Sequence, residues 1–371
     1  MITTIIIFLI VLSVLVLVHE FGHFFTARWF GVKTEEFGLG FPPRAIGFYK
    51  DLKGKWRRLS GNKDIESLEG DNKPSDTVYS LNWLPIGGFV KIKGENGDSR
   101  DEKDSFGAKK IWKRAVVLSA GVVMNIILAF VLFSLCFMIG APQSVDTGGK
   151  IQITEVLKGS AAQHAGILSG DVIKGADGQN FSTVLSVQNY ISAKGGNEVA
   201  LNLVRGGKSI SVNIKPELKD GKGIMGVGLD QLATVRYSFF QAIWEGLKHT
   251  AIILWMIIVA FVGLIRNLIM GAGAGDAVGG PIRIAQMTGE VARFGFVNLL
   301  NFTAILSLNL AVINILPFPA LDGGRIFFLI LEKIKGKPVK RETEAIIHNI
   351  GFMILLALIV LVTYKDIARM F

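Results

Sequence analysis

Long apolar runs constrain the fold of this chain more than any other feature of its sequence. The first covers Met1 to about Phe25, and others cover 115–140, 297–316 and about 346–363. Because an α-helix rises about 1.5 Å per residue, about 20 apolar residues cross the roughly 30 Å hydrocarbon core of a bilayer. Hydrophobic residues make up 50% of the chain, which is high for a soluble enzyme. The sequence therefore predicts a polytopic α-helical membrane protein with about four transmembrane helices.

The placement of charge predicts which side of the membrane each loop occupies. The net charge is +10, and many of the basic residues lie beside the apolar runs, within 28–114 and 333–341. Membrane proteins retain Lys and Arg in their cytoplasmic loops, so this distribution indicates two cytoplasmic segments and no nucleic-acid partner. Met1–Val18 has no basic residue and is not followed by a cleavage site of small residues, which favours a retained span over a signal peptide.

Two segments between the spans have the composition of folded structure. Segment 27–114 contains "EFGLGFPPRAIGFYK" and "LNWLPIGGFVKIKGE", whose alternation and turn formers predict a β-hairpin region close to the membrane. Segment 141–235 contains a short strand ("IQITEV"), a helix ("VLSVQNYISAKG") and two strands joined at Gly206-Gly207, which predict a small α+β domain. The charge pattern places this domain on the external side of the membrane.

The first apolar run, within a predicted transmembrane helix at 1–26, ends in a potential metal site. His19 and His23 stand four residues apart, so on a helix their imidazoles project from one face and can bind one ion. Glu20 projects nearby but off that line, which suits a general base acting on water at the metal. Ionisable side chains at membrane depth are costly and usually functional, so a pair of ordinary polar helix residues is the weaker interpretation.

A catalytic zinc ion needs three protein ligands and one open position, so the third ligand must come from elsewhere in the chain. His164, His249 and His348 have no partner at ligand spacing, and we expect them to be surface or interfacial histidines.

Asp322 is a different kind of candidate. It follows Pro317 and Pro319, which break the preceding span, and irregular backbone at membrane depth is tolerated where it lines a cavity. Alternatively, Asp322 is the N-cap of the next helix. Its distance from the two histidines distinguishes these roles.

The membrane topology tests whether Asp322 can reach the histidines. If the first span runs inward, the second span at 115–140 returns outside, and the third, within 297–324, brings Asp322 back to the cytoplasmic side. A further full crossing by the apolar run 249–269 would place Asp322 on the opposite side. We therefore predict that 236–296 is an interfacial or peripheral helical segment. The remainder is then a cytoplasmic loop at 325–345 and a fourth span within 346–371.

Taken together, these features resemble the site-2 protease family of intramembrane zinc proteases, in particular its RseP-like bacterial branch with a single PDZ domain. The resemblance covers nearly the whole chain and rests on His19-Glu20-x-x-His23 and on Asn314-x-x-Pro317-x-Pro319-x-Leu321-Asp322-Gly323. The segments "FGLGFPPR", "LNWLPIGGFVKIKGE" and "AVVLSAGVVMN" are similar to further family segments, but Val122 stands where proline is usual.

The resemblance implies a site with specific roles. The cofactor would be Zn²⁺, held by His19, His23 and Asp322, with Glu20 as the catalytic base. The substrate-binding residues would be Asn314 and, with a weaker match, Asn309, together with Pro317 and Pro319. Polar contact between packed helices is the alternative for both asparagines. The strands around Gly38 to Phe48 and Gly87 to Lys93 could also pair with a substrate strand.

The same resemblance implies the partners and the location of the protein. The substrate would be a single-pass transmembrane protein, either an anti-sigma factor or a remnant signal peptide, cleaved within the lipid bilayer. The protein would lie in the bacterial cytoplasmic (inner) membrane, with its PDZ-like domain outside, where that domain either filters substrates by size or binds peptides.

Two other classes of function compete with a protease. One is a membrane-anchored PDZ scaffold whose metal site is inert, and the other is a transporter that uses the intramembrane charges. No internal repeat is visible, which argues against the paired-repeat plan of many transporters.

Overall fold

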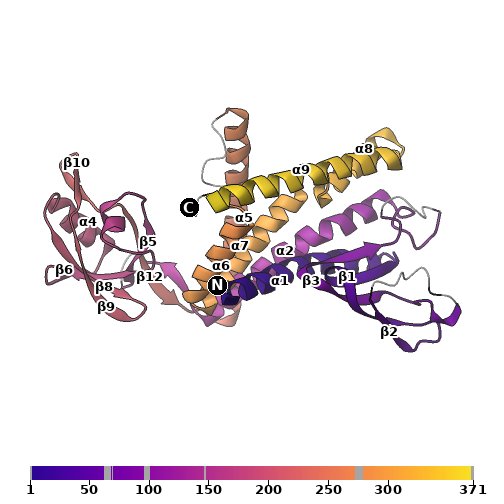
Figure 1. Ribbon diagram of the computed structural model, residues 1–371, viewed down its shortest axis with the longest axis horizontal. Helices are drawn as coiled ribbons and strands as arrows, with labels where there is room; N and C mark the ends of the chain where they lie inside the picture. Colours follow the sequence, from indigo (N-terminus) through magenta and orange to yellow (C-terminus); the bar gives the residue numbers. More distant parts are fainter. Residues whose placement is uncertain are drawn as a thin grey trace. The chain divides into compact units, whose positions relative to one another are not determined.

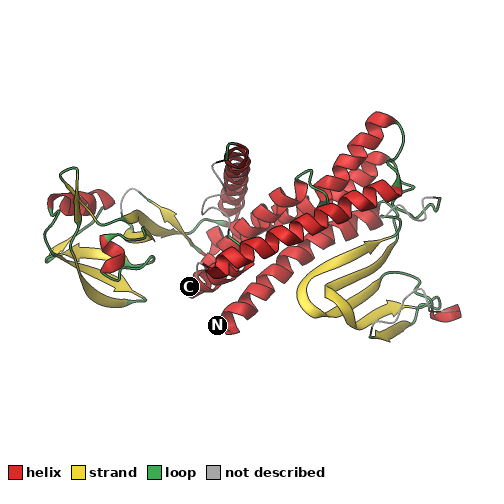
Figure 2. Ribbon diagram, turned by 45° about the horizontal axis from the view of Figure 1, so that its top comes forward, coloured by secondary structure: helices red, strands yellow, loops and turns green. Residues whose placement is uncertain are grey.

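The chain folds into two compact units. A computed structural model describes residues 2–61, 68, 70–95, 101–145, 148–271 and 279–368. One unit combines Met1–Leu135 with Ile243–Phe371, and the other is formed by Cys136–Ala242 (Figure 1). The first unit consists mainly of long helices with one small sheet, whereas the second is rich in strands (Figure 2).

The helices account for all the predicted spans and add several further elements. In chain order they are α1 (Ile2–Trp29), a 3₁₀ helix at Gly70–Asn72, α2 (Ile111–Ile139), α3 (Ala161–His164), α4 (Val184–Ala193), α5 (Phe239–Ile269), α6 (Pro281–Arg293), α7 (Phe296–Ile315), α8 (Asp322–Lys335) and α9 (Arg341–Ala368).

Five helices in the described part of the chain are long and apolar enough to cross a membrane: α1, α2, α5, α7 and α9. Four of them match the four predicted spans. The fifth, α5, contains the run 249–269 that we predicted to be interfacial or peripheral, and the most apolar part of α5 is not buried inside the protein. The number of helices that cross the bilayer stays a prediction.

The first half of the predicted cytoplasmic loop at 325–345 is helical, because α8 extends to Lys335. The helix ends at Gly336, whose φ of 69° is a left-handed conformation that favours glycine. Two ion pairs fix α8 to its surroundings: Arg114 of α2 binds Glu332, and Arg325 binds Glu95.

The first unit contains an antiparallel sheet in the order β2-β1-β3, as the predicted β-hairpin region requires. Its strands are β1 (Thr34–Lys50), β2 (Trp56–Ser60) and β3 (Val78–Ile92). β1 pairs with both ends of β3, for example Phe37 with Val90 and Gly47 with Ser80. Both strands contain a glycine with positive φ, Gly40 (79°) and Gly87 (74°). α1 packs against β3, so the end of β3 lies beside the predicted metal site.

The second unit is a sheet packed on two short helices. Its strands are β4 (Ala141–Ser144), β5 (Lys150–Val156), β6 (Val172–Ala176), β7 (Gln179–Asn180), β8 (Val199–Arg205), β9 (Lys208–Ile214), β10 (Glu217–Lys219), β11 (Lys222–Ile224) and β12 (Val227–Val235). The main sheet runs β4-β12-β5-β6-β8-β9, with β7 on β6, and β10 pairs with β11.

The local structure expected for the second unit is present. The strand "IQITEV" lies in β5, the predicted helix is α4, and β8 and β9 are joined at Gly206-Gly207. Thr183 and Ser186 form a capping box at the start of α4, and each satisfies a backbone N–H of the other. The core is aliphatic, with Ile153, Leu201 and Val187 fully buried. The unit therefore has a hydrophobic core of its own.

Candidate metal centre

The regular geometry of α1 brings the two histidines of the motif together. His19 and His23 are each 6% exposed, and their Nε2 atoms lie 3.2 Å apart. The rings meet edge to face with centroids 4.9 Å apart. Two imidazoles one helical turn apart therefore point their Nε2 atoms at the same small volume.

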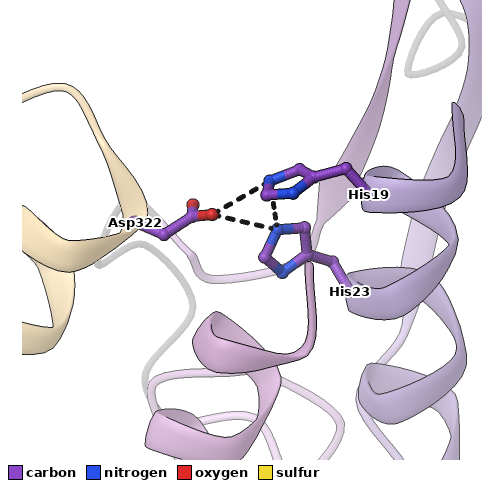
Figure 3. A group of neighbouring side chains, drawn as sticks. All are labelled: His19, His23 and Asp322. Carbon is purple, nitrogen blue, oxygen red and sulfur yellow. Dashed lines mark hydrogen bonds and ion pairs between the residues drawn. The ribbon is translucent and has the colours of Figure 1, made fainter. Parts of the chain in front are cut away.

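Asp322 completes the cluster from a distant part of the chain. Its Oδ2 lies 3.0 Å from His19 Nε2 and 3.4 Å from His23 Nε2 (Figure 3). The three side chains form a group whose potential ligand atoms all lie within 4.8 Å of one another. The N-cap of α8 is Leu321, and Asp322 is the first helical residue, without a side-chain capping bond. The alternative role of Asp322 as a helix cap is therefore wrong.

Hydrogen bonds to the Nδ1 atoms orient the two imidazoles and determine which ring nitrogen carries the proton. His23 Nδ1 lies 2.8 Å from the carbonyl oxygen of Val117 in α2. A carbonyl oxygen can only accept a hydrogen bond. The proton of a neutral His23 is therefore on Nδ1, and Nε2 carries a free lone pair.

Asn125 plays the corresponding part for His19, and the sequence analysis did not single it out. Its side-chain amide is fully buried in α2, with Nδ2 3.2 Å from His19 Nδ1. Its Oδ1 has no partner among the described residues, so turning the amide would let that oxygen accept a hydrogen bond from Nδ1–H of His19. Outer partners of this kind orient metal-binding histidines. The only signal in the sequence was an amide within an apolar run, at the end of "AVVLSAGVVMN".

The donor atoms fit a small cation. With both rings protonated on Nδ1, two nitrogen lone pairs and a carboxylate oxygen face one another, an arrangement that a positive ion stabilises. Apart from its contacts with the two imidazoles, Asp322 Oδ2 has no hydrogen-bond partner in the described part of the chain. Ligands about 2.0–2.1 Å from a tetrahedral zinc ion lie about 3.3 Å from one another. The observed separations of 3.0, 3.2 and 3.4 Å agree with that value.

Glycine on α2 provides the room for this cluster. A Cβ atom at Gly121 would lie 2.5 Å from His23 Nε2 and 2.7 Å from His19 Nε2. Any side chain at this position would therefore occupy the volume between the rings. A Cβ atom at Gly22 of α1 would overlap the carbonyl of Ala120, so glycine is also what lets the two helices approach each other.

Glu20 lies beside the cluster and is held by the sheet. Its Oε2 accepts a hydrogen bond of 3.0 Å from the backbone N–H of Val90 in β3. The carboxylate is thus oriented by a strand that also pairs with β1. It lines the same cleft as His19 and Asp322 without joining the group of three.

A cleft of about 230 Å³ opens onto the cluster. It is lined by Val16, His19, Glu20, Leu310, Asn314, Ala320, Leu321 and Asp322. Asn314 Nδ2 lies 3.4 Å from His19 Nε2, so this amide faces the site. Asn309 does not: its Nδ2 donates to the carbonyl of Ile305 within α7. Of the two asparagines, the structure brings only Asn314 to the cleft.

A tight turn between α7 and α8 presents Asp322. Pro317 and Pro319 lie in this turn, and Phe318 N–H and Leu321 N–H bond to carbonyls within it. Cβ atoms at Gly323 and Gly324 would overlap the backbone carbonyls of the α7 end and of Phe318. Neither proline lines the cleft, so their observed role is to shape the turn.

His348, which we expected to be a surface or interfacial histidine, lies against this turn. Its ring is half-buried, and its Nδ1 accepts a 2.9 Å hydrogen bond from the backbone N–H of Ala320. His249 is partly buried, and its ring packs on Phe133 with centroids 4.7 Å apart. Neither belongs to the cluster of potential metal ligands found in the described residues.

Comparison with known proteins relates this arrangement to a family. The model of peptidase family M50 matches residues 7–57 and 68–358. A protein of Clostridium perfringens named as a zinc metalloprotease, CPE1693, is 34% identical, and the match covers 97% of each chain. Another so named, Atu1380 of Agrobacterium fabrum, is 30% identical over 98% of this chain and 95% of its own.

Two further matches complete the comparison. The regulator of sigma-W protease RasP of Bacillus subtilis is 29% identical over 100% of this chain and 99% of its own. Among solved structures, the PDZ domain of the SdrC-like protein Lmo2051 from Listeria monocytogenes is 26% identical, with a TM-score of 0.21, and the match covers 22% of this chain and 90% of that one. On the family match and these relatives, the chain is a zinc metalloprotease and an integral membrane protein, and it belongs to peptidase family M50, the site-2 proteases.

Proposed function

We propose that this protein is an intramembrane zinc endopeptidase that cleaves transmembrane segments of single-pass membrane proteins. The observation that carries the proposal is the meeting of His19, His23 and Asp322 beside the C-terminal half of an apolar helix long enough to span a bilayer. His19, His23 and Asp322 are the proposed zinc ligands, because their separations suit a tetrahedral ion and leave one position for water.

The chemistry at this centre is assigned to Glu20 and to the three proposed zinc ligands. Zinc bound here would supply a Lewis acid that polarises the peptide carbonyl and lowers the pKa of water. Glu20 takes a proton from the attacking water and delivers it to the departing amide nitrogen. Before substrate binds, the Val90 N–H bond holds the Glu20 carboxylate at the cleft.

The substrate backbone is held by groups on two sides of the cleft. A helix hides its carbonyls in internal hydrogen bonds, so the segment to be cut must be extended locally. Asn314 offers both a donor and an acceptor to such a strand. The Gly87–Ile92 part of β3 lies next to α1 and is proposed to pair with the substrate by strand addition.

The nature of the substrate follows from the membrane setting and from one relative. RasP is named as a regulator of sigma-W protease, which supports an anti-sigma factor as the substrate class, with remnant signal peptides as the second class. We place the protein in the bacterial cytoplasmic membrane with the metal centre near the inner face. Cys136–Ala242 is the proposed external PDZ-like unit, which filters or binds substrates before cleavage.

The decisive experiment uses the purified full chain in lipid nanodiscs with a fluorescent single-pass helix as substrate. Wild-type protein should cleave it, and a zinc chelator should stop cleavage until zinc is restored. Glu20→Gln should lower kcat by about 10²–10⁴-fold while zinc content stays near one per chain. The matched control is Glu290→Gln, which alters an exposed glutamate on α6 and should cleave normally.

The alternatives predict different results. A scaffold with an inert site would bind peptide but show no cleavage with any variant. Wild-type protein that carries no zinc, or cleavage that survives Glu20→Gln, would refute the proposal.

A further inference from the structure

The turn that presents Asp322 contains a backbone conformation that its own residues do not favour. Ala320 has a φ of +76°, a left-handed conformation that L side chains other than Asn and Asp seldom adopt. The residue lies two positions before Asp322 and lines the cleft. Something outside the turn must stabilise this conformation for the carboxylate to stay in place.

The contact that does so comes from the last helix. The N–H of Ala320 donates a 2.9 Å hydrogen bond to Nδ1 of His348 in α9. The same imidazole packs on the ring of Phe328 in α8, with centroids 5.5 Å apart. Phe328 lies six residues after Asp322, so His348 contacts the chain on both sides of the proposed ligand.

A close approach of the backbones supports the same contact one turn along α9. A Cβ atom at Gly351 would lie 2.7 Å from the carbonyl oxygen of Pro319, closer than real Cβ atoms come. His348 and Gly351 are three residues apart and share one face of the helix. This face of α9 therefore lies directly on the Pro319–Ala320 segment.

The protonation state of His348 follows from the donor it meets. Because Nδ1 accepts the Ala320 N–H, a neutral ring carries its proton on Nε2. Nε2 is buried with no partner among the described residues. His348 also lines a polar cavity of about 370 Å³ together with Glu95, Arg325, Arg341, Glu344, Ala345 and Asn349, which has room for water beside the ring.

We infer that His348 is a positioning residue for the metal centre: by accepting the Ala320 N–H it fixes the turn, and thereby the Asp322 carboxylate, against the two histidines. The inference rests on the proposed function, because it assumes that Asp322 binds zinc. His348 belongs neither to the group of three potential ligands nor to the lining of the cleft.

The test compares removal of the acceptor with its replacement. His348→Leu removes it, whereas His348→Asn keeps an oxygen near the position of Nδ1. Zinc content, the rate of zinc loss to a chelator, kcat, KM and thermal unfolding are measured for both in nanodiscs. His348→Leu should lose zinc about 10–100-fold faster than wild type and show a lower kcat with a smaller change in KM. His348→Asn should recover most of the zinc retention. Asn349→Ala, on the same helix and cavity, should match wild type.

A second variant covers the case in which His348→Leu folds poorly. Glycine adopts positive φ freely, so Ala320→Gly should reduce the need for the hydrogen bond. The double variant His348→Leu/Ala320→Gly should therefore release zinc more slowly than His348→Leu. A merely structural role of the ring would give no such recovery.

Each outcome decides the inference. Equal zinc release by wild type and His348→Leu would refute it while leaving the proposed function intact. No recovery in either His348→Asn or the double variant would also refute it. Absence of zinc from the wild-type protein would refute both proposals together.

Discussion

The metal centre is assembled from two regions that are opposite in kind. The histidines stand on a regular helix, where their spacing alone makes them neighbours. The Asp322 carboxylate follows an irregular turn in which Ala320 adopts a left-handed backbone conformation. Close contacts of this turn with α7 and α9 position the carboxylate. Helical donors are therefore set by local geometry, whereas the third donor depends on tertiary packing. A change on the helix should act by removing a ligand or its space, and a change near the turn should act by displacing one.

Loss of a ligand tests whether the two regions contribute equally, and it has the largest expected effect. His23→Ala and Asp322→Ala should both abolish stoichiometric zinc binding, because two ligands do not hold a catalytic ion. Lewis-acid stabilisation is worth several kcal/mol, so activity should fall at least about 10³-fold in each. Elemental analysis and the nanodisc cleavage assay measure both quantities. Full zinc occupancy in Asp322→Ala would show that the turn does not supply a ligand.

The second test adds a side chain next to the two histidines of α1. Gly121→Ala places a methyl group between the imidazoles, so zinc affinity and activity should fall by about 10–100-fold, a range typical of disturbed metal sites. Gly263→Ala in α5 is the matched control, since a Cβ atom there meets nothing within 4 Å. The control should keep its zinc and gain up to about 1 kcal/mol of stability. Equal behaviour of the two variants would contradict the assigned position of Gly121.

Crowding the turn side should have a smaller effect, because the turn can move. Gly323→Ala pushes the start of α8 away from the carbonyls of Ile315 and Leu316. Overpacking of this kind costs about 1–3 kcal/mol of stability. We expect a lower unfolding temperature and about 10-fold faster zinc release. A variant with a lower unfolding temperature but a normal rate of zinc release would show that the turn does not control the metal site.

The two asparagines of α7 give the smallest expected effects. Asn314→Ala removes an amide that faces the cleft, so kcat/KM should fall about 10-fold, the value of roughly one hydrogen bond. Asn309→Ala removes a bond within the helix, and kcat/KM should fall by at most about 3-fold. Cleavage rates across a range of substrate concentrations measure the difference. A larger loss in Asn309→Ala would mean that substrate reaches further along α7 than the cleft indicates.

The same contrast explains what could be predicted from the sequence. The spacing of His19 and His23 needs only a helix, and the second unit is marked by alternating strands and glycine turns, so both were predictable. The contacts of Asn125 with His19 and of His348 with the Ala320 N–H were not, because each joins segments far apart in the chain. Asn309 and Asn314 are the same residue type in the same helix, and they differ in their rotation about the α7 axis and in their position along it. The extension of α8 to Lys335 was not predicted, because basic residues near its end suggested a loop.

The hydrogen bond between Glu20 and Val90 has a consequence for inhibitor design and for catalysis alike. A backbone N–H makes one strong hydrogen bond at a time, and here that bond goes to Glu20, the proposed catalytic base. A peptide that docks along the outer edge of β3 and seeks the same amide must compete with Glu20 for it. When such a strand takes the Val90 N–H, the Glu20 carboxylate loses that hydrogen bond and is released into the cleft.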